Sequence, residues 1–556
     1  MGSRMTKAFG KVFAALSVLA LGTNALYGAD YYVSPTGNDT NPGSESKPWR
    51  SIAKANDSLH PGDTVYLMNG EYRERIEPAR SGASDRYITY QAYAGHAPVI
   101  TAPPGKIAIV LNNRSYIRID RLTIDGRKPY KDANVDQWAE LIDSHHNVFQ
   151  NSRFKYAKGW TAFYLQGSHY NKLINNRMDY VGTFFDAEKA EGTGDMIALH
   201  CANHNLFEGN ELTRAGHDLL TVAGDYNVIR NNIFENKWGK NEGYRAISLS
   251  ANRRFCDTTR GFNVFEKNIV KNSLLAHGDF RGSSADKEPM AMKVEGVNQI
   301  VRHNVFANNV GPAVSGSIRP PKIMAVQSNK IYNNVVYEGG GLWMMRDYGN
   351  AGPASNNEFK NNIVYASRAD AEVFVNYSSA NRTPLEQNFF THNAFSQSTD
   401  TTKFKIKGLD TTTLAWLEEN ASDNFRNNIT RAPHFSSENL QDEQGFRLNR
   451  GSPMIDSGDF LTKTLDAGSG KTVEVVDAGW FTDGFGIVGG DRVQIGENPP
   501  VQVSKVDYEN GILFLESSIS WGADQAVSLA YEGAAPDIGA YEYREEQEAS
   551  SVPSDH

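Results

Sequence analysis

Short stretches in the middle of the chain alternate apolar with polar residues. Examples are VFQNSRF (148–154), KLINNRM (172–178) and NVIRNNIFEN (227–236). A period of two with many β-branched and aromatic residues is typical of short β-strands. Since no central stretch keeps a helical apolar stripe over three turns, the pattern predicts an all-β fold.

An asparagine motif accompanies these strands. It consists of Asn, then Asn or Ser five residues later, then an apolar residue seven residues after the first Asn. The copies are Asn147-Ser152-Phe154, Asn171-Asn176-Met178, Asn205-Asn210-Leu212, Asn227-Asn232-Phe234, Asn263-Asn268-Val270, Asn329-Asn334-Val336 and Asn357-Asn362-Val364, with Asn298-Asn304-Phe306 carrying one extra residue. Copies start 22 (Asn205 to Asn227) to 36 (Asn227 to Asn263) residues apart. Self-similarity at such a period is typical of a solenoid.

The predicted architecture is a single-stranded right-handed parallel β-helix. Asn and Gly tolerate left-handed turn conformations, and stacked Asn side chains can satisfy buried turn amides. A β-propeller or a sandwich with Asn-rich turns is the alternative fold, but a propeller needs longer blades.

Both ends of the chain differ from this pattern. Residues 1–29 are predicted to be a cloning remnant and a secretory signal peptide, because VFAALSVLALG follows two lysines and precedes small residues. A helix near 51–58 is expected to cap the open end of a β-helix that covers 30–455. Residues 456–533 alternate in strands joined by Gly, Asp and Asn turns, which predicts a small antiparallel β-barrel insertion. A closing strand at 534–545 and a disordered tail at 546–556 complete the expected organisation.

Composition limits the partners. The net charge is -9, so no basic surplus exists to neutralise nucleic-acid phosphates. No later stretch is long and apolar enough to span a membrane. The protein is therefore expected to be secreted or periplasmic and monomeric. An acidic polysaccharide remains a possible partner, because a local basic groove can exist on an acidic protein. Cys201 and Cys256 could form a disulfide or remain buried thiols.

Counting back from each Asn predicts columns of stacked residues. The first Asn of each copy is called its anchor. Five residues before an anchor lie Gln166, His200 and Lys293, and ten residues before one lie Asp195, His217 and Glu288. Such polar columns are either solvated surface or a substrate groove, and His200 and His217 are the candidate substrate contacts. The spacing of His200 and His204 would suit zinc on a helix, but this segment has strand and turn character, which favours packed histidines.

The densest polar segment is 286–321. Asp286 and Glu288 alternate on a strand and therefore share one face, and with an Asn oxygen they would suit calcium. This segment resembles polysaccharide lyase family 6, the alginate lyases and chondroitinase B. The resemblance implies Asp286 and Glu288 as calcium ligands, Lys293 as the base and Arg319 one coil later.

The same resemblance places a calcium-binding Asn one coil earlier, where Asn241 is the best match and Asn268 the second. Arg245 lies nearby as a substrate contact. The implied reaction is calcium-assisted β-elimination on a uronate-containing polysaccharide. Lys293 would take the proton, Arg319 would hold substrate charge, and Tyr244 or His277 would supply the second proton.

Two other functions fit the same residues. A glycoside hydrolase needs a pair of carboxylates, which Asp195, Asp218, Asp279, Asp286 and Glu288 could provide. A protein that only binds glycans would use aromatic platforms, for which the candidates are Trp160, Tyr164, Trp238, Tyr244, Trp343 and Tyr348.

Overall fold

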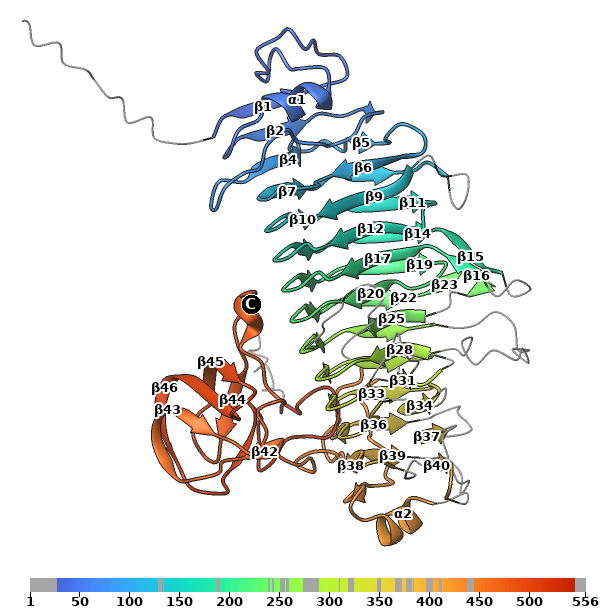
Figure 1. The fold of residues 1–556 in the computed structure, drawn as a ribbon, viewed down its shortest axis with the longest axis vertical. Helices are drawn as coiled ribbons and strands as arrows, with labels where there is room; N and C mark the ends of the chain where they lie inside the picture. Colours follow the sequence, from blue (N-terminus) through green and yellow to red (C-terminus); the bar gives the residue numbers. More distant parts are fainter. Residues whose placement is uncertain are drawn as a thin grey trace, which may run out of the picture.

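The computed structural model describes residues 28–545, apart from 129–132, 134, 187–190, 239–240, 243–244, 251–255, 257–259, 274–289, 310, 319–324, 348–351, 366–372, 377–382, 384, 397–403, 410–412 and 438–444. Within these residues the chain winds into a tall stack of parallel strands with a smaller domain at its side (Figure 1). The predicted β-helix is confirmed.

A central coil contributes one strand to each of three parallel sheets. The first sheet holds fourteen strands in the order β1 (Asp30–Val33), β2 (Thr64–Leu67), β4 (Ile88–Ala92), β7 (Ile117–Asp120), β10 (Val148–Gln150), β13 (Lys172–Ile174), β18 (Leu206–Glu208), β21 (Val228–Arg230), β26 (Val264–Glu266), β29 (Ile300–Arg302), β32 (Lys330–Tyr332), β35 (Glu358–Lys360), β38 (Phe389–Thr391) and β41 (Phe425–Arg426).

The second sheet follows the first around each coil. Its strands are β3 (Glu71–Tyr72), β5 (Val99–Ile100), β8 (Thr123–Asp125), β11 (Arg153–Ala157), β14 (Arg177–Val181), β19 (Glu211–Ala215), β22 (Ile233–Glu235), β27 (Ile269–Lys271), β30 (Val305–Ala307), β33 (Val335–Tyr337), β36 (Ile363–Tyr365) and β39 (Ala394–Ser396).

The third sheet closes the coil. Its strands are β6 (Lys106–Val110), β9 (Val135–Ile142), β12 (Thr161–Gln166), β17 (Asp195–His200), β20 (Leu220–Ala223), β25 (Arg245–Ser250), β28 (Met290–Glu295), β31 (Val314–Ile318), β34 (Trp343–Asp347), β37 (Val373–Asn376) and β40 (Phe404–Ile406). Two antiparallel hairpins project beside it, β15 (Thr183–Asp186) with β16 (Glu191–Thr193) and β23 (Lys237–Trp238) with β24 (Asn241–Glu242).

The asparagine motif builds two ladders, one at the turn between the third and first sheets and one at the turn between the first and second sheets. In a typical rung, the Asn205 side-chain amide donates to the Asn227 Oδ1 atom at 3.1 Å, and Asn205 Oδ1 accepts the Asn171 backbone N–H at 2.9 Å. A parallel ladder runs through Asn176, Asn210 and Asn232. These bonds satisfy turn amides that burial would otherwise leave unpaired.

One predicted rung is wrong. Asn298 is not the anchor of its coil, because Gln299 accepts the Asn263 amide at 3.0 Å and its N–H reaches Asn329 Oδ1 at 2.8 Å. Asn298 takes a left-handed turn position (φ 56°) instead. The spacing from Gln299 to Asn304 is therefore the regular one, and this coil is not irregular.

Two short α-helices lie at the ends of the stack. Helix α1 (Ile52–Ser58) begins at the N-cap Ser51, whose hydroxyl accepts the Lys54 N–H, and α2 (Leu414–Asn420) begins at Thr413. In the part of the chain that is described, no helix has the length and apolarity needed to cross a membrane. Both cysteines lie in that part, and they form no disulfide.

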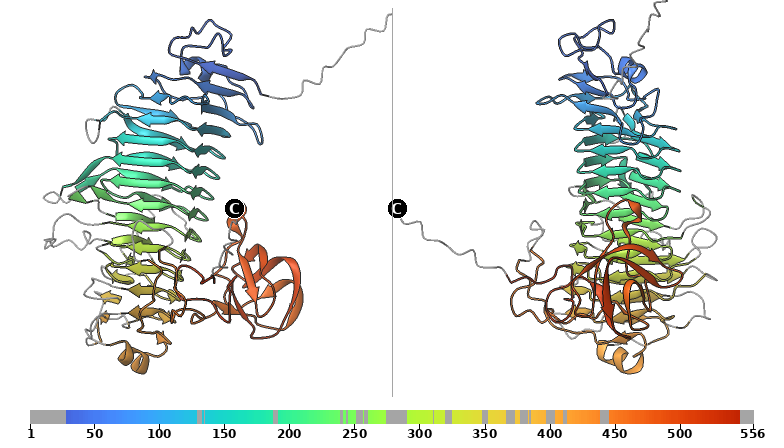
Figure 2. Two further views of the ribbon diagram at one scale, coloured as in Figure 1. Left: turned by 180° about the vertical axis from the view of Figure 1, so that it is seen from behind. Right: turned by 90° about the vertical axis from the view of Figure 1, so that its left-hand side faces the viewer.

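A six-stranded antiparallel sheet forms the C-terminal domain. It consists of β42 (Thr462–Lys463), β47 (Ala526–Leu529), β44 (Arg492–Ile495), β45 (Val501–Asp507), β46 (Ile512–Trp521) and β43 (Gly468–Glu474). Figure 2 shows the domain beside the lower coils in both views. Residues 534–545 carry no strand, but the Ile538 and Gly539 N–H groups donate to the Met454 and Asn361 carbonyls.

The domain docks on the outer side of the first sheet through buried charges. Arg302 pairs with Glu266 on the neighbouring coil and with Asp491 of the domain, at 2.7 and 2.6 Å. The Tyr332 hydroxyl donates to the Trp480 carbonyl at 2.7 Å. This contact covers the first sheet and leaves the third sheet uncovered by the domain.

Candidate functional site

Three titratable side chains meet where two neighbouring strands of the third sheet begin. Asp195 opens β17, and His217 and Asp218 lie in the turn directly before β20. The strand register pairs Ile197 with Leu220, so Asp218 stands one coil from Asp195 in the same column. Among the described residues, this is the one group of three His, Cys, Asp or Glu side chains arranged to hold a metal ion, with ligand atoms within 4.8 Å of one another.

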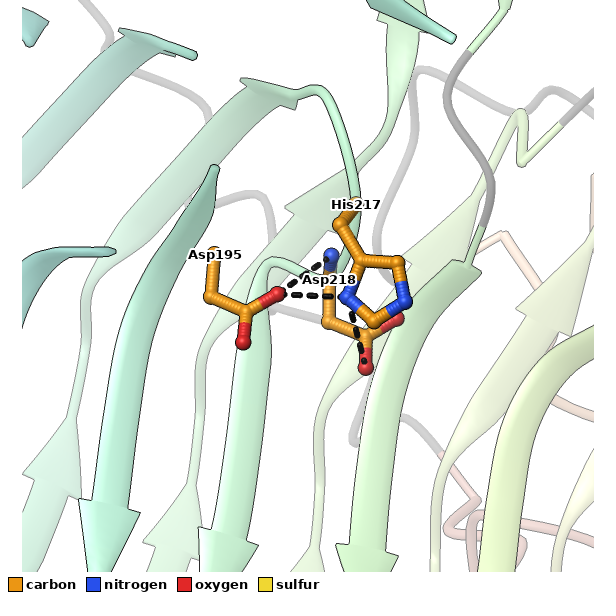
Figure 3. A group of neighbouring side chains, drawn as sticks. All are labelled: Asp195, His217 and Asp218. Atoms are coloured by element: carbon orange, nitrogen blue, oxygen red, sulfur yellow. Dashed lines mark hydrogen bonds and ion pairs between the residues drawn. The ribbon is translucent and has the colours of Figure 1, made fainter. Parts of the chain in front are cut away.

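The imidazole lies between the two carboxylates (Figure 3). His217 Nδ1 is 2.6 Å from Asp195 Oδ1 and 3.6 Å from Asp218 Oδ2. Asp195 Oδ1 also accepts the Asp218 backbone N–H at 3.2 Å, and the Thr221 hydroxyl donates to Asp218 Oδ2 at 3.1 Å.

Burial makes this cluster chemically unusual. Asp195 and Asp218 are 6% and 1% exposed, whereas the His217 side chain is 36% exposed. Burying two carboxylates together is costly unless a positive charge or hydrogen bonds compensate them. The cluster can therefore attract a divalent cation or fix the tautomer and orientation of a histidine that takes part in proton transfer.

The donor set fits calcium. Asp195, Asp218 and the Thr221 hydroxyl supply oxygen atoms, which a hard cation prefers. His217 contributes a nitrogen, which is a less suitable calcium ligand. These residues differ from the predicted calcium ligands Asn241, Asp286 and Glu288.

An aromatic group adjoins the cluster on the N-terminal side. His200 ends β17, and its Nδ1 atom lies 3.0 Å from the Tyr164 hydroxyl, which also donates to Gln166 Oε1 at 2.8 Å. Burial lowers the pKa of His200, and Asp195 partly opposes this effect. Trp160 packs against His200 with ring centroids 5.8 Å apart. His200 is thus a buried histidine with a lowered pKa on the strand that Asp195 opens, and its role as a substrate contact stays a prediction.

His204 does not join His200 as a metal ligand pair. Its ring stacks between Tyr170 at 4.8 Å and Tyr226 at 5.2 Å. This stack continues through Phe262 to Tyr508 of the C-terminal domain, where the ring centroids are 4.0 Å apart. The two histidines therefore serve different structures, in line with the expectation of packed histidines.

Lys293 lies on β28 and pairs with Glu295 at 2.5 Å. Both side chains are buried. The register aligns Lys293 with Ser248 and Thr221, whereas Glu295 aligns with Ser250.

The two predicted columns are therefore wrong beyond their first members. Gln166 does pair with His200, but the next members are Ala223 and then, two coils further, Glu295. Asp195 stands opposite Asp218 rather than His217. The sequence distance from the third sheet to the anchor differs from coil to coil, from four residues after Ala223 to thirteen after Ser250, so counting back from the anchor loses the register.

Most of the other predicted residues cannot be placed in atomic detail. Those that lie outside the described residues are Tyr244, His277, Asp286, Glu288 and Arg319. Asn241 is placed by its backbone in the β23–β24 hairpin, opposite Trp238. Arg245 opens β25, one coil beyond Asp218 in the same column.

Sequence reasoning missed that Asp195, His217 and Asp218 form one cluster. The sequence pattern places Asp195 and His217 in one column and offers Asp195 and Asp218 as hydrolase carboxylates, but it does not bring all three side chains together. A usable signal was present, because Asp195 opens one strand and the His217-Asp218 pair directly precedes the next strand of the same sheet.

Comparison with known proteins places the chain among β-helix proteins. Residues 31–309, half of the chain, match the family model described as "Pel9A-like, right handed beta helix region". The solved structure of pectate lyase Pel9A is similar, with 16% identity, coverage of 93% of this chain and 97% of that one, and a TM-score of 0.46.

Three curated relatives are similar in sequence. The protein YwoF of Bacillus subtilis is 26% identical over 65% of this chain and 75% of its own length. A lacto-N-biosidase of Bifidobacterium longum is 24% identical over 65% of this chain, but the match spans only 26% of the enzyme. Pectate lyase PEL9 of Emericella nidulans is 36% identical over 78 residues, which are 14% of this chain and 19% of that one.

Proposed function

Because the chain belongs to the family of Pel9A-like right-handed β-helix proteins, we propose that it is a polysaccharide lyase that cleaves a uronate-containing acidic polysaccharide by calcium-assisted β-elimination. The observation that carries the proposal is the cluster of Asp195, His217 and Asp218 on the sheet that the C-terminal domain leaves open. The similarity to pectate lyase PEL9 over 78 residues supports the same class of reaction.

The chemistry of the reaction explains why such a cluster is useful. β-Elimination removes the proton next to the uronate carboxylate, the C–O bond to the leaving sugar breaks, and a carbon–carbon double bond forms. Proton removal adds negative charge to a group that is already an anion. Calcium, when bound, would neutralise the carboxylate and stabilise that charge. Asp195 and Asp218 would hold the cation, with the Thr221 hydroxyl next to Asp218.

Two side chains are candidates for the base. Lys293 is the base implied by the sequence resemblance, and it lies two coils beyond Thr221 in the same column. Its contact with Glu295 stabilises a charged ammonium, whereas a base must be neutral. His217 is the second candidate, since its Nδ1 atom contacts Asp195 and its side chain is partly exposed. Separate Lys293→Ala and His217→Ala variants distinguish them, because only loss of the base abolishes product at saturating substrate and calcium.

The test is an assay for unsaturated uronate. The purified protein is incubated with polygalacturonate, alginate or chondroitin sulfate, and the ultraviolet absorbance of the unsaturated product is followed. We expect product from at least one polymer, loss of product with chelator, and recovery when calcium is restored. New reducing ends without unsaturated uronate would overturn the proposal.

A hydrolase is the second candidate. The lacto-N-biosidase relative favours it, as do two carboxylates whose ligand atoms lie within 4.8 Å, near the separation of about 5–5.5 Å in retaining glycosidases. A hydrolase would release reducing sugar in the presence of chelator.

A further inference from the structure

An exposed tryptophan stands next to the cluster. Trp160 directly precedes β12 and is 56% exposed. Its carbonyl accepts the Asp195 backbone N–H at 3.0 Å, so it lies one coil to the N-terminal side of Asp195. Exposing so much apolar surface is unfavourable for folding, and the position beside a buried carboxylate cluster points to a ligand.

Its neighbours keep the indole in place. Tyr164 and His200 lie with ring centroids 6.4 and 5.8 Å from the Trp160 ring. The Tyr164 hydroxyl bonds to His200, whose strand begins at Asp195 of the cluster. An aromatic side chain held on a rigid sheet loses little conformational freedom when it binds a ligand.

A hollow of about 470 Å³ adjoins the indole on the side away from the cluster. Its charged lining consists of Arg75, Lys106 and Asp136. Gly159 lies at its edge, and a Cβ atom there would come within 2.5 Å of the Asp136 carbonyl. Only glycine therefore allows this close approach of the two coils.

The hollow extends along the axis of the β-helix. The register aligns Ile107 with Gln137, and Gln137 stands in the column of Thr161 and Asp195. Successive coils are about 4.8 Å apart, so the hollow lies about 10–14 Å from Asp195 along the axis. That distance suits neighbouring sugars of one extended chain.

The chemistry of the lining selects the ligand. The face of an indole packs against the apolar face of a sugar ring. Lys106 is exposed and can pair with a carboxylate, and Asp136 can accept a hydroxyl hydrogen bond. Arg75 adds a second positive charge, although it also pairs with Glu77 at 2.7 Å.

We propose that Trp160 and this hollow form a binding subsite for a uronate sugar of the substrate chain, on the N-terminal side of the Asp195 cluster. The polysaccharide then lies along the third sheet, parallel to the β-helix axis. This inference rests on the proposed function for the acidic nature of the substrate.

Binding measured without turnover tests the subsite. The full-length Asp218→Asn protein is titrated by calorimetry with uronate dimers and hexamers of the polymer that binds best. Adding Trp160→Ala to the Asp218→Asn protein should weaken binding of the hexamer about tenfold, which corresponds to ~1.4 kcal/mol. Binding of the dimer should change little. Trp160→Phe should retain most of the affinity. The matched control is Trp416→Ala, since Trp416 is 39% exposed on α2 at the other end of the β-helix.

A second variant tests the charge preference. Lys106→Gln should weaken binding of the uronate hexamer and leave a fully methyl-esterified hexamer unaffected. Unchanged hexamer binding by Trp160→Ala overturns the subsite, as does equal loss for the acidic and the esterified hexamer in Lys106→Gln. The proposed function fails separately, when the wild-type protein binds the hexamer but forms no unsaturated product.

Discussion

The two faces of the β-helix use buried charge in opposite ways. On the first sheet, Arg302 is buried between Glu266 and Asp491, and the C-terminal domain seals this network. On the third sheet, Asp195 and Asp218 are equally buried, but they share the partly exposed His217. Burial of charge alone thus does not mark an active site. Access to solvent is what separates the candidate site from the docking interface.

The largest expected effect comes from the open face. Asp218→Asn keeps the shape of the side chain but removes one charge from the cluster, so we expect product formation to fall about 100-fold or more. The rate of unsaturated uronate formation measures it. Glu211→Gln is the matched control, because Glu211 lies on β19 of the same coil and pairs with Arg177 on the second sheet. Activity of Asp218→Asn within tenfold of the wild type would contradict the assignment.

The covered face should respond in stability rather than in activity. Asp491→Asn removes one of the two carboxylates around a buried guanidinium, and breaking a buried pair typically costs about 3 kcal/mol or more. Chemical denaturation followed by tryptophan fluorescence measures the free energy of unfolding. In Asp524→Asn the lost pair, with Lys463, is exposed, so the cost should stay below about 1 kcal/mol. Equal costs for both variants would contradict a structural role of the buried network.

The Asn ladder is the next test. Asn232 donates to Asn268 Oδ1 at 3.0 Å and to the Phe207 carbonyl at 2.9 Å, and it accepts the Asn210 N–H at 2.8 Å. Asn232→Ala leaves these groups buried and unpaired, so a loss of about 2–3 kcal/mol is expected. Asn298→Gly, outside the ladder and compatible with the left-handed backbone at this position, should cost less than about 1 kcal/mol. Thermal unfolding of both variants measures the difference, and equal losses would count against the ladder as a source of stability.

The fold could be predicted from the sequence because the residues that form the ladder follow a short motif that recurs in successive coils. Asn176, Asn210 and Asn232 recur with an apolar residue two positions later, and this spacing alone indicates the coil. The motif did not identify Gln299, because a Gln side chain makes the ladder hydrogen bonds at this position in place of an Asn side chain. The neighbouring Asn298 offered a false match.

The candidate site could be predicted only in part. His217 and Asp195 were both identified, but their contact depends on the turn before β20, whose conformation no periodicity encodes. Lys293 falls two residues from its expected column because Gln299, and not Asn298, is the anchor of its coil and the column residue Glu295 lies only four residues before it. The strand registers that bring Asp195 and Asp218 together are properties of the folded coil, so they become visible only in the structure.

The smallest expected effect concerns pH and the docked C-terminal segment. Burial, reinforced by Asp537, raises the pKa of Glu542 from its usual 4.5 to about 8. A carboxyl with a raised pKa in the folded state stabilises that state fully below 4.5, and this contribution is lost as the pH rises through about 8. Glu542→Gln should therefore unfold at a higher temperature than the wild type at about pH 9 and show a smaller difference at about pH 5. Scanning calorimetry at both pH values measures this, with Glu545→Gln, an exposed neighbour, as the control. Parallel profiles for the wild type and Glu542→Gln would show that Glu542 is not protonated in the folded protein, and that the covered face carries one more charge than the structure implies.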